Sequence, residues 1–110
     1  TVSDLKRLYY LHLSHNHFRE IPRYFCKMRD LIHLDLSYNH LHTIPDSIDE
    51  FKQLEMLNLY GNPIENLPQS LTTMDKLEEL YLDEHCPSSF PKKYQGNLHR
   101  VRKYFSELAD

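Results

Sequence analysis

The sequence repeats itself with a period of 23 residues, and this repetition limits the possible fold more than any other feature of the chain. Four segments follow the pattern L-x-x-L-x-L-x-x-N or a close variant, and they begin at Leu8, Leu31, Leu54 and Leu77. An apolar residue followed by proline recurs later in each unit, at Ile21-Pro22, Ile44-Pro45, Leu67-Pro68 and Phe90-Pro91. Repetition of this length and regularity is typical of solenoids, in which similar units stack one on the next.

The spacing of the leucines predicts short parallel strands. Successive residues of a strand point to opposite faces, so each L-x-L segment places its leucines on one face and the intervening residue on the other. A single unit cannot bury its own leucines, and stacking with its neighbours gives all units one shared core. Each proline ends further strand pairing and begins the segment that returns along the outer face.

A column of asparagines follows the predicted strands. It consists of Asn16, Asn39 and Asn62, and His85 takes the fourth place. An asparagine amide can both donate to and accept from backbone groups that a turn would otherwise leave unpaired. Because an unpaired buried polar group costs about 1–3 kcal/mol, we interpret this column as a structural ladder without a catalytic role. We expect the ladder to end at Asn62 or to continue through the imidazole of His85.

Together, these residues resemble the leucine-rich repeat family, in particular its 23-residue intracellular class. The end of the chain resembles the C-terminal cap of that class, because the run from Phe90 to Gly96 is followed by apolar residues at helical spacing, with Asn97 as a candidate N-cap. The resemblance implies an α/β solenoid: a leucine-rich repeat horseshoe with short parallel strands on its concave face and a C-terminal capping helix. It also implies a protein-interaction module.

The repeat divides the chain into three parts. We expect residues 1–7 to be the remnant of a preceding repeat, residues 8–91 to hold three complete repeats and one shortened repeat, and residues 92–110 to form the helical cap. One side of the cap should cover the core through Tyr94, Leu98, Val101, Phe105 and Leu108. Its basic residues should remain in solvent: Lys92, Lys93, Arg100, Arg102 and Lys103.

Composition narrows the class of protein. A chain of 110 residues with 40% hydrophobic residues can form one small domain. Its formal net charge of −3 argues against a nucleic-acid partner, since nucleic-acid-binding domains usually carry a basic excess. No window approaches the roughly 18 apolar residues of a membrane span, so we expect no membrane insertion. We also expect a monomer.

The cysteines favour a reducing compartment. Cys26 and Cys86 fall in different repeats and at different places within the unit. Their Cα atoms should therefore lie farther apart than the ~4.4–6.8 Å that a disulfide allows. Free thiols are typical of reducing compartments, which predicts a cytoplasmic protein, with the nucleus as the alternative.

The residues between the leucines form the candidate binding surface. They should line up in columns on the concave face, and the sequence reveals no folding role for them. Exposed tyrosine and methionine are typical of interfaces. As partner-contacting residues we select Tyr10, His12, His33, Asp35, Tyr38, Met56, Asn58, Tyr60, Glu79 and Tyr81.

Catalytic and metal sites are not predicted. The eight histidines lack the spacing of a closed metal site, although His12, His15 and His33 could approach one another. Ser14 and Ser37 could also lie near these histidines, but an open sheet offers no pocket that excludes water from a nucleophile. We therefore expect no catalytic residue, no metal and no cofactor.

The sequence thus predicts a non-catalytic module that binds a protein partner on its concave face, as the C-terminal part of a longer intracellular scaffold or adaptor. The alternative is the recognition segment of a multidomain enzyme, a kinase or a GTPase, whose catalytic part lies outside this chain. A purely structural array is a third reading. The sequence does not identify the partner.

Overall fold

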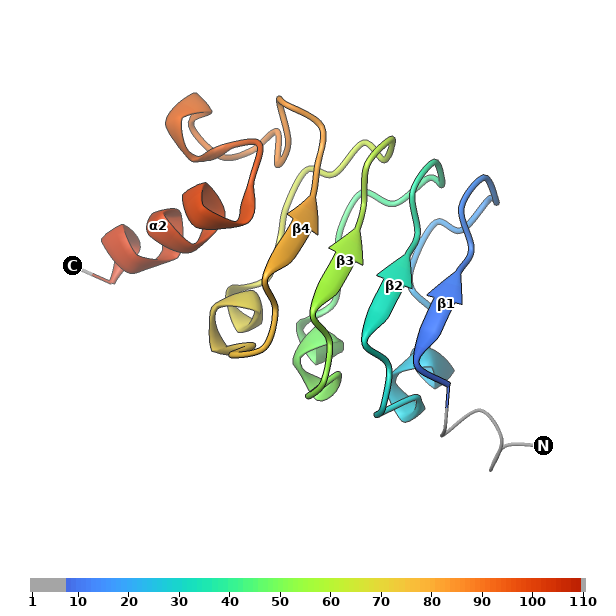
Figure 1. Ribbon diagram of the computed structural model, residues 1–110. Coiled ribbons are helices and arrows are strands. Elements are labelled where there is room, and N and C mark those ends of the chain that lie inside the picture. The colour runs from blue at the N-terminus through green and yellow to red at the C-terminus, as the bar shows by residue number, and fades with distance from the viewer. Residues whose placement is uncertain (1–7, 110) are drawn as a thin grey trace.

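The computed structural model describes residues 8–109, so the expected remnant of a preceding repeat, residues 1–7, lies outside the described part. Within it, four short strands form one parallel sheet in the order β1-β2-β3-β4 (Figure 1). Their bounds are Tyr10–His12 (β1), His33–Asp35 (β2), Met56–Asn58 (β3) and Glu79–Tyr81 (β4). Each residue pairs with the one 23 positions later, as Leu11 does with Leu34. The predicted solenoid of short parallel strands is therefore confirmed.

A short 3-10 helix lies on each return segment, and Figure 1 shows these segments running behind the sheet. In the described chain the bounds are Arg23–Lys27 (η1), Asp46–Glu50 (η2), Gln69–Thr73 (η3) and Lys92–Tyr94 (η4). Every one of them begins directly after a proline: Pro22, Pro45, Pro68 or Pro91. Proline fixes its own φ and has no N–H to leave unpaired, so it suits the place where strand pairing stops and the chain turns back.

The core lies between the sheet and the return segments. Leu34 and Leu57, in the middle of their strands, are fully buried, and so is Ile48 on η2. Phe51 closes the same layer from the end of η2 with 1% of its surface exposed. Each layer packs on the layers of the neighbouring repeats, so the apolar surface of one unit is removed from water only by the next unit.

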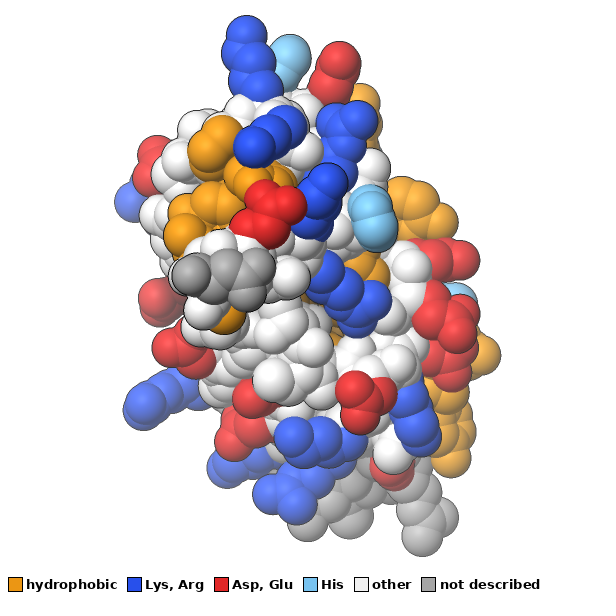
Figure 2. Space-filling model, turned by 90° about the vertical axis from the view of Figure 1, so that its left-hand side faces the viewer, with side chains coloured by type: hydrophobic (Ala, Val, Ile, Leu, Met, Phe, Trp, Pro, Cys, Tyr) orange, Lys and Arg blue, Asp and Glu red, His pale blue; other side chains and the backbone are white. Residues whose placement is uncertain are grey.

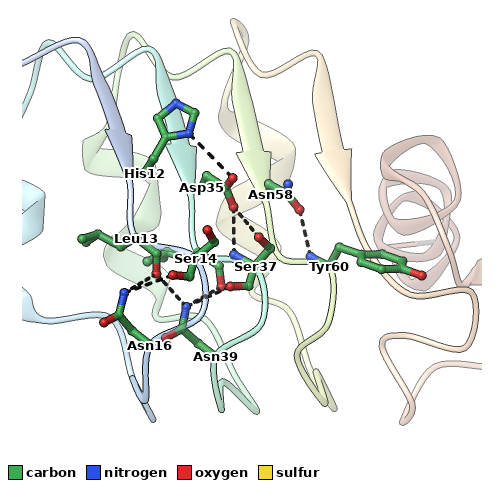
Figure 3. A network of polar contacts seen from close by, with 10 residues as sticks. His12, Leu13, Ser14, Asn16, Asp35, Ser37, Asn39, Asn58 and Tyr60 are labelled. Carbon is green, nitrogen blue, oxygen red and sulfur yellow. Dashed lines mark hydrogen bonds and ion pairs between the residues drawn. The ribbon is translucent and has the colours of Figure 1, made fainter.

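The asparagine ladder connects neighbouring repeats. Asn39 Oδ1 accepts a hydrogen bond from the N–H of Phe18 in the preceding repeat at 3.1 Å, and Asn39 Nδ2 donates to Leu13 O and Leu36 O at 3.1 and 2.9 Å. Figure 3 shows Asn39 and Asn16 converging on the Leu13 carbonyl. Asn62 repeats the arrangement one unit later. The structural interpretation of this column is confirmed.

The ladder ends at Asn62, because the His85 side chain is exposed. The neighbouring Cys86 is buried instead, and its Sγ lies 3.8 Å from Asn62 O, as a weak donor to that carbonyl. Burial raises the pKa of the Cys86 thiol, and the carboxylate of Asp83 raises it further. The thiol therefore keeps its proton at neutral pH and can donate. Of the two expected endings, the one without the imidazole is correct.

Helix α2, Leu98–Leu108, closes the far end of the solenoid beside β4 (Figure 1). Asn97 is its N-cap, as predicted, because Asn97 Oδ1 accepts from the N–H of Arg100 at 2.9 Å. Leu98 and Val101 are buried against the last repeat. No helix in residues 8–109 is both long and apolar enough to cross a membrane.

Two expectations for the cap are wrong. Leu108 does not cover the core: it is 63% exposed, because it lies in the last turn of α2, whereas Tyr104 stacks on Phe90 with ring centroids 3.9 Å apart. Arg102 is not left in solvent. Its Nη2 donates to Met74 O at 3.1 Å and to Leu77 O at 3.0 Å. These carbonyls lie at the end of the repeat array, and the guanidinium supplies donors there.

The ladder predicts a ranking among its three asparagines. Asn62 Oδ1 accepts from two buried N–H groups, those of Asn39 and Leu41, and Asn39 Oδ1 accepts from one, that of Phe18. Within the described part of the chain, Asn16 bonds only to carbonyls of its own turn. At about 1–3 kcal/mol for each orphaned N–H, alanine should destabilise most at Asn62, less at Asn39 and least at Asn16. Urea unfolding measures the three free energies, and equal losses would contradict the ladder.

The role of Arg102 predicts that Arg102→Met lowers the free energy of unfolding by about 1.5–3 kcal/mol, because a hydrogen bond from a charged donor is lost and Leu77 O is left unpaired. Lys103→Met is the matched control. Lys103 is exposed and only 3.9 Å from Glu107 in an i,i+4 pair, so its replacement should change stability by less than about 0.5 kcal/mol. Equal effects in urea unfolding would show that Arg102 does not close the array.

Candidate functional site

The residues between the core leucines form one continuous surface, which we call the sheet face. Strand register aligns them in columns, and parallel bonding continues past the strands, where the N–H of His15 donates to Ser37 O and that of Tyr38 to Tyr60 O. The sheet face comprises Tyr10, His12, Ser14, His15, His33, Asp35, Ser37, Tyr38, Met56, Asn58, Tyr60, Gly61, Glu79, Tyr81, Asp83 and Glu84. All ten residues selected from the sequence belong to this surface.

Four tyrosines dominate the sheet face. Each is about half exposed, from 46% for Tyr38 to 56% for Tyr10, with Tyr60 and Tyr81 at 47%. Tyr10 and Tyr81 lie on β1 and β4, and Tyr38 and Tyr60 lie just beyond the ends of β2 and β3. Each ring is left half in water and has contact area still to be covered. The strands below the rings are held by the shared core, so the rings are presented on a rigid support.

Two selected residues turn out to have a folding role, which corrects the expectation that these positions have none. Asp35 Oδ1 accepts from the N–H and the hydroxyl of Ser37, at 2.9 and 2.7 Å, and Asn58 Oδ1 accepts from the N–H of Tyr60 at 3.0 Å (Figure 3). Both bonds reach two residues ahead, which is the Asx turn that Asp and Asn favour. The sequence carried this signal, because an Asp or Asn stands at the same place in two consecutive repeats.

Backbone geometry fixes the rings beyond the strands. His15, Tyr38 and Gly61 occupy one column, and all three have positive φ, at 59°, 55° and 79°. The Tyr38 ring lies over Gly61 so closely that a Cβ on Gly61 would come within 2.5 Å of it. His15 stacks on the other side of Tyr38, with centroids 4.6 Å apart, and Tyr60 meets Tyr38 edge to face at 5.8 Å. The requirement for glycine at position 61 was missed from the sequence.

The outer ends of the sheet face are also ordered. Tyr10 and His33 pack edge to face, with ring centroids 4.9 Å apart. On β4, the Tyr81 hydroxyl donates to Glu79 Oε2 at 3.0 Å. This hydrogen bond to a carboxylate raises the pKa of Tyr81, and the negative charge of Glu79 raises it further. Tyr81 therefore stays protonated near neutral pH and continues to hold Glu79.

The arrangement does not form a hydrolase triad. His12 Nδ1 lies 3.8 Å from Asp35 Oδ2, but the Ser37 hydroxyl donates to Asp35 directly instead of to a histidine, and Ser37 is buried (Figure 3). The histidine is 62% exposed, so its pairing with the carboxylate contributes little. Within residues 8–109, no group of three or more His, Cys, Asp or Glu side chains is placed to hold a metal ion.

Comparisons with known proteins agree with this architecture. The family model described as "Leucine rich repeat" matches residues 6–64, which is more than half of the chain. A solved leucine-rich repeat protein of Leptospira interrogans is similar over 72% of this chain, with 30% identity and a TM-score of 0.65. The leucine-rich repeat domain of the type III effector XopL is similar over 74%, with 26% identity and a TM-score of 0.64.

The chain is much shorter than those two proteins. It covers 21% of the Leptospira chain and 28% of the XopL chain. None of the curated proteins compared with the sequence matches it.

The contact between Tyr38 and Gly61 predicts that Gly61→Ala destabilises the fold by about 2 kcal/mol or more, through the clash and the positive φ together. In a Tyr38→Ser background the clash is gone and only the cost of φ, about 1 kcal/mol, should remain. Gly96→Ala is the control, because its φ is also positive and its nearest neighbour is Glu84 O at 3.4 Å. Gly96→Ala should lower the free energy of unfolding by the same amount with Tyr38 and with Tyr38→Ser. If the loss caused by Gly61→Ala is also the same in both backgrounds, the contact between Tyr38 and Gly61 is refuted.

Proposed function

Because this chain belongs to the leucine-rich repeat family, whose members are commonly protein-interaction modules, we propose that it is a non-catalytic module that binds a protein partner on the sheet face. The observation that carries the proposal is the row of half-exposed rings at Tyr10, Tyr38, Tyr60 and Tyr81. Tyrosine is enriched among the residues that dominate binding energy at interfaces.

The order of the surface supports binding by the rings. Tyr38 is held between His15 and Gly61, and Tyr81 is held by its hydrogen bond to Glu79. An ordered side chain loses less conformational freedom when a partner covers it, whereas ordering a free side chain costs about 0.5–1.5 kcal/mol. More of the contact energy therefore remains for affinity.

The size of the surface supports a role as part of a longer protein. A stable interface usually takes some 20–30 residues from each side. The sheet face offers 16 positions, and some of them, such as Ser37 and Gly61, present little surface. The chain also spans only 21% and 28% of the two similar solved proteins. We propose that it is the C-terminal part of a larger scaffold or adaptor whose other repeats extend the same face.

We also propose that this protein is cytoplasmic. Cys86 is a free, buried thiol, and free cysteines are typical of proteins in reducing compartments. Localisation of a tagged full-length protein by fluorescence microscopy tests this part. Entry into the secretory pathway would contradict it.

Binding through the rings predicts different results for Tyr60→Ala and Tyr24→Ala. Tyr24 lies on η1, away from the sheet face, and it is 57% exposed. Both variants should unfold within about 0.5 kcal/mol of the parent chain, as surface substitutions usually do. In affinity capture from cell lysate, read by quantitative mass spectrometry, proteins held by the parent and by Tyr24→Ala should be lost with Tyr60→Ala. If Tyr24→Ala alone loses them, the binding surface lies on the outer side.

A further inference from the structure

We infer that the sheet face binds a positively charged protein segment, with arginine as its preferred anchor. This inference rests on the proposed function and adds the chemistry of the partner. It depends on charge complementarity between the surface and its occupant, and on the placement of carboxylates beside exposed rings.

The sheet face carries acidic side chains and no Lys or Arg. None of its 16 positions is Lys or Arg, although the chain contains 13 such residues. Four positions are acidic: Asp35, Glu79, Asp83 and Glu84. With histidine neutral, the sheet face therefore carries a formal charge of −4, compared with −3 for the whole chain. An approaching cationic segment is attracted to this face and meets no Lys or Arg on it.

The negative charge is concentrated in the fourth repeat, which holds three of the four acidic positions together with Tyr81. Asp83 accepts from the N–H of Gly61 at 3.2 Å, which places its carboxylate next to Tyr60. Glu79 is bonded to the hydroxyl of Tyr81, and Glu84 follows on the same repeat. Carboxylates therefore stand beside the half-exposed Tyr81 and next to the turn that carries Tyr60.

Arginine fits this pattern better than lysine does. A guanidinium is planar, so it can stack on a tyrosine face while two of its N–H groups donate parallel hydrogen bonds to a neighbouring carboxylate. An ammonium group acts as a point charge and stays more strongly hydrated. A neutral apolar segment is disfavoured, because it would remove water from Glu79 and Asp83 without supplying a partner.

The described Lys and Arg side chains leave these carboxylates available. Among the described residues, the one ion pair recorded on the sheet face is His12 with Asp35, and neither Glu79 nor Glu84 has a Lys or Arg within 4.0 Å. Figure 2 looks onto the capped end of the solenoid. Lys and Arg gather over that end. Acidic, hydrophobic and His side chains share the right-hand edge, which is the face that Figure 1 turns toward the viewer and on which the sheet lies.

Synthetic peptides test the inference with defined probes. We would titrate the 110-residue chain into fluorescein-labelled peptides of about ten residues, long enough when extended to cross all four strands. Serine alternates with Arg, Lys, Gln or Glu in the four peptides, and anisotropy gives each Kd. We expect the Arg peptide to bind most tightly, the Lys peptide several-fold more weakly, and the Gln and Glu peptides not at all.

A charge-matched pair of variants locates the site. Glu79→Gln with Glu84→Gln removes two negative charges from the sheet face, and glutamine keeps an oxygen that can accept from Tyr81. Asp46→Asn with Glu50→Gln removes two charges from the exposed side of η2. We expect the first pair to raise the Kd of the Arg peptide about tenfold and the second pair to raise it less than about twofold. Raising NaCl from about 50 to 500 mM should weaken binding to the parent at least tenfold.

Each contrary outcome has a distinct meaning. Equal losses with the two variant pairs would overturn the inference, because the peptide would then respond to net charge alone. Binding of the Gln peptide that Tyr60→Ala abolishes would also overturn it, yet it would leave the proposed function intact with a neutral partner. If no peptide binds and Tyr60→Ala loses no captured protein, both the inference and the proposed function fail.

Discussion

The fold depends on hydrogen bonds that pass from one repeat to the next at the turn after each strand. There the chain leaves the sheet and its N–H groups lose their strand partners, so an asparagine from the following unit accepts from them. The dependence has a direction, because the turn containing Phe18 is completed by Asn39 and the turn containing Leu41 by Asn62. A repeat is therefore finished only when its successor is in place. At the end of the array the contacts between units are different: Cys86 donates to Asn62 O, and Arg102 donates to Met74 O and Leu77 O.

Much of the fold was predictable because it follows from local pattern. The period predicted the strand register, the prolines marked the start of each return segment, and Asn97 was recognised as a cap from its place before an apolar stripe. Arg102 could not be predicted in this way. Its role depends on how α2 lies across the end of the sheet, and an arginine on an amphipathic helix usually faces solvent.

The candidate site was predicted as a surface, but the sequence analysis did not separate its exposed residues from those that stabilise the turns. Columns of residues between leucines could be read directly, and their tyrosines are exposed as expected. Asp35 and Asn58 are different, because each closes a turn through a bond two residues ahead. An Asp or Asn at this spacing is a local signal that sequence reasoning could have used. The need for glycine at position 61 arises from the Tyr38 ring in the neighbouring repeat, and the residues adjacent to Gly61 in the sequence do not indicate it.

The packing of Tyr38 on Gly61 has a consequence for how such an array could change in length. An identical copy of the second repeat, inserted directly after it, would bring a tyrosine to the place that Gly61 now occupies. Its Cβ would then lie about 2.5 Å from the ring of the preceding tyrosine, too close for real atoms. The unit with tyrosine in this column must be followed by one with glycine, whereas His15 can precede it because the two rings stack. The repeats share one backbone plan but are not interchangeable, and their order along the chain is part of the structure.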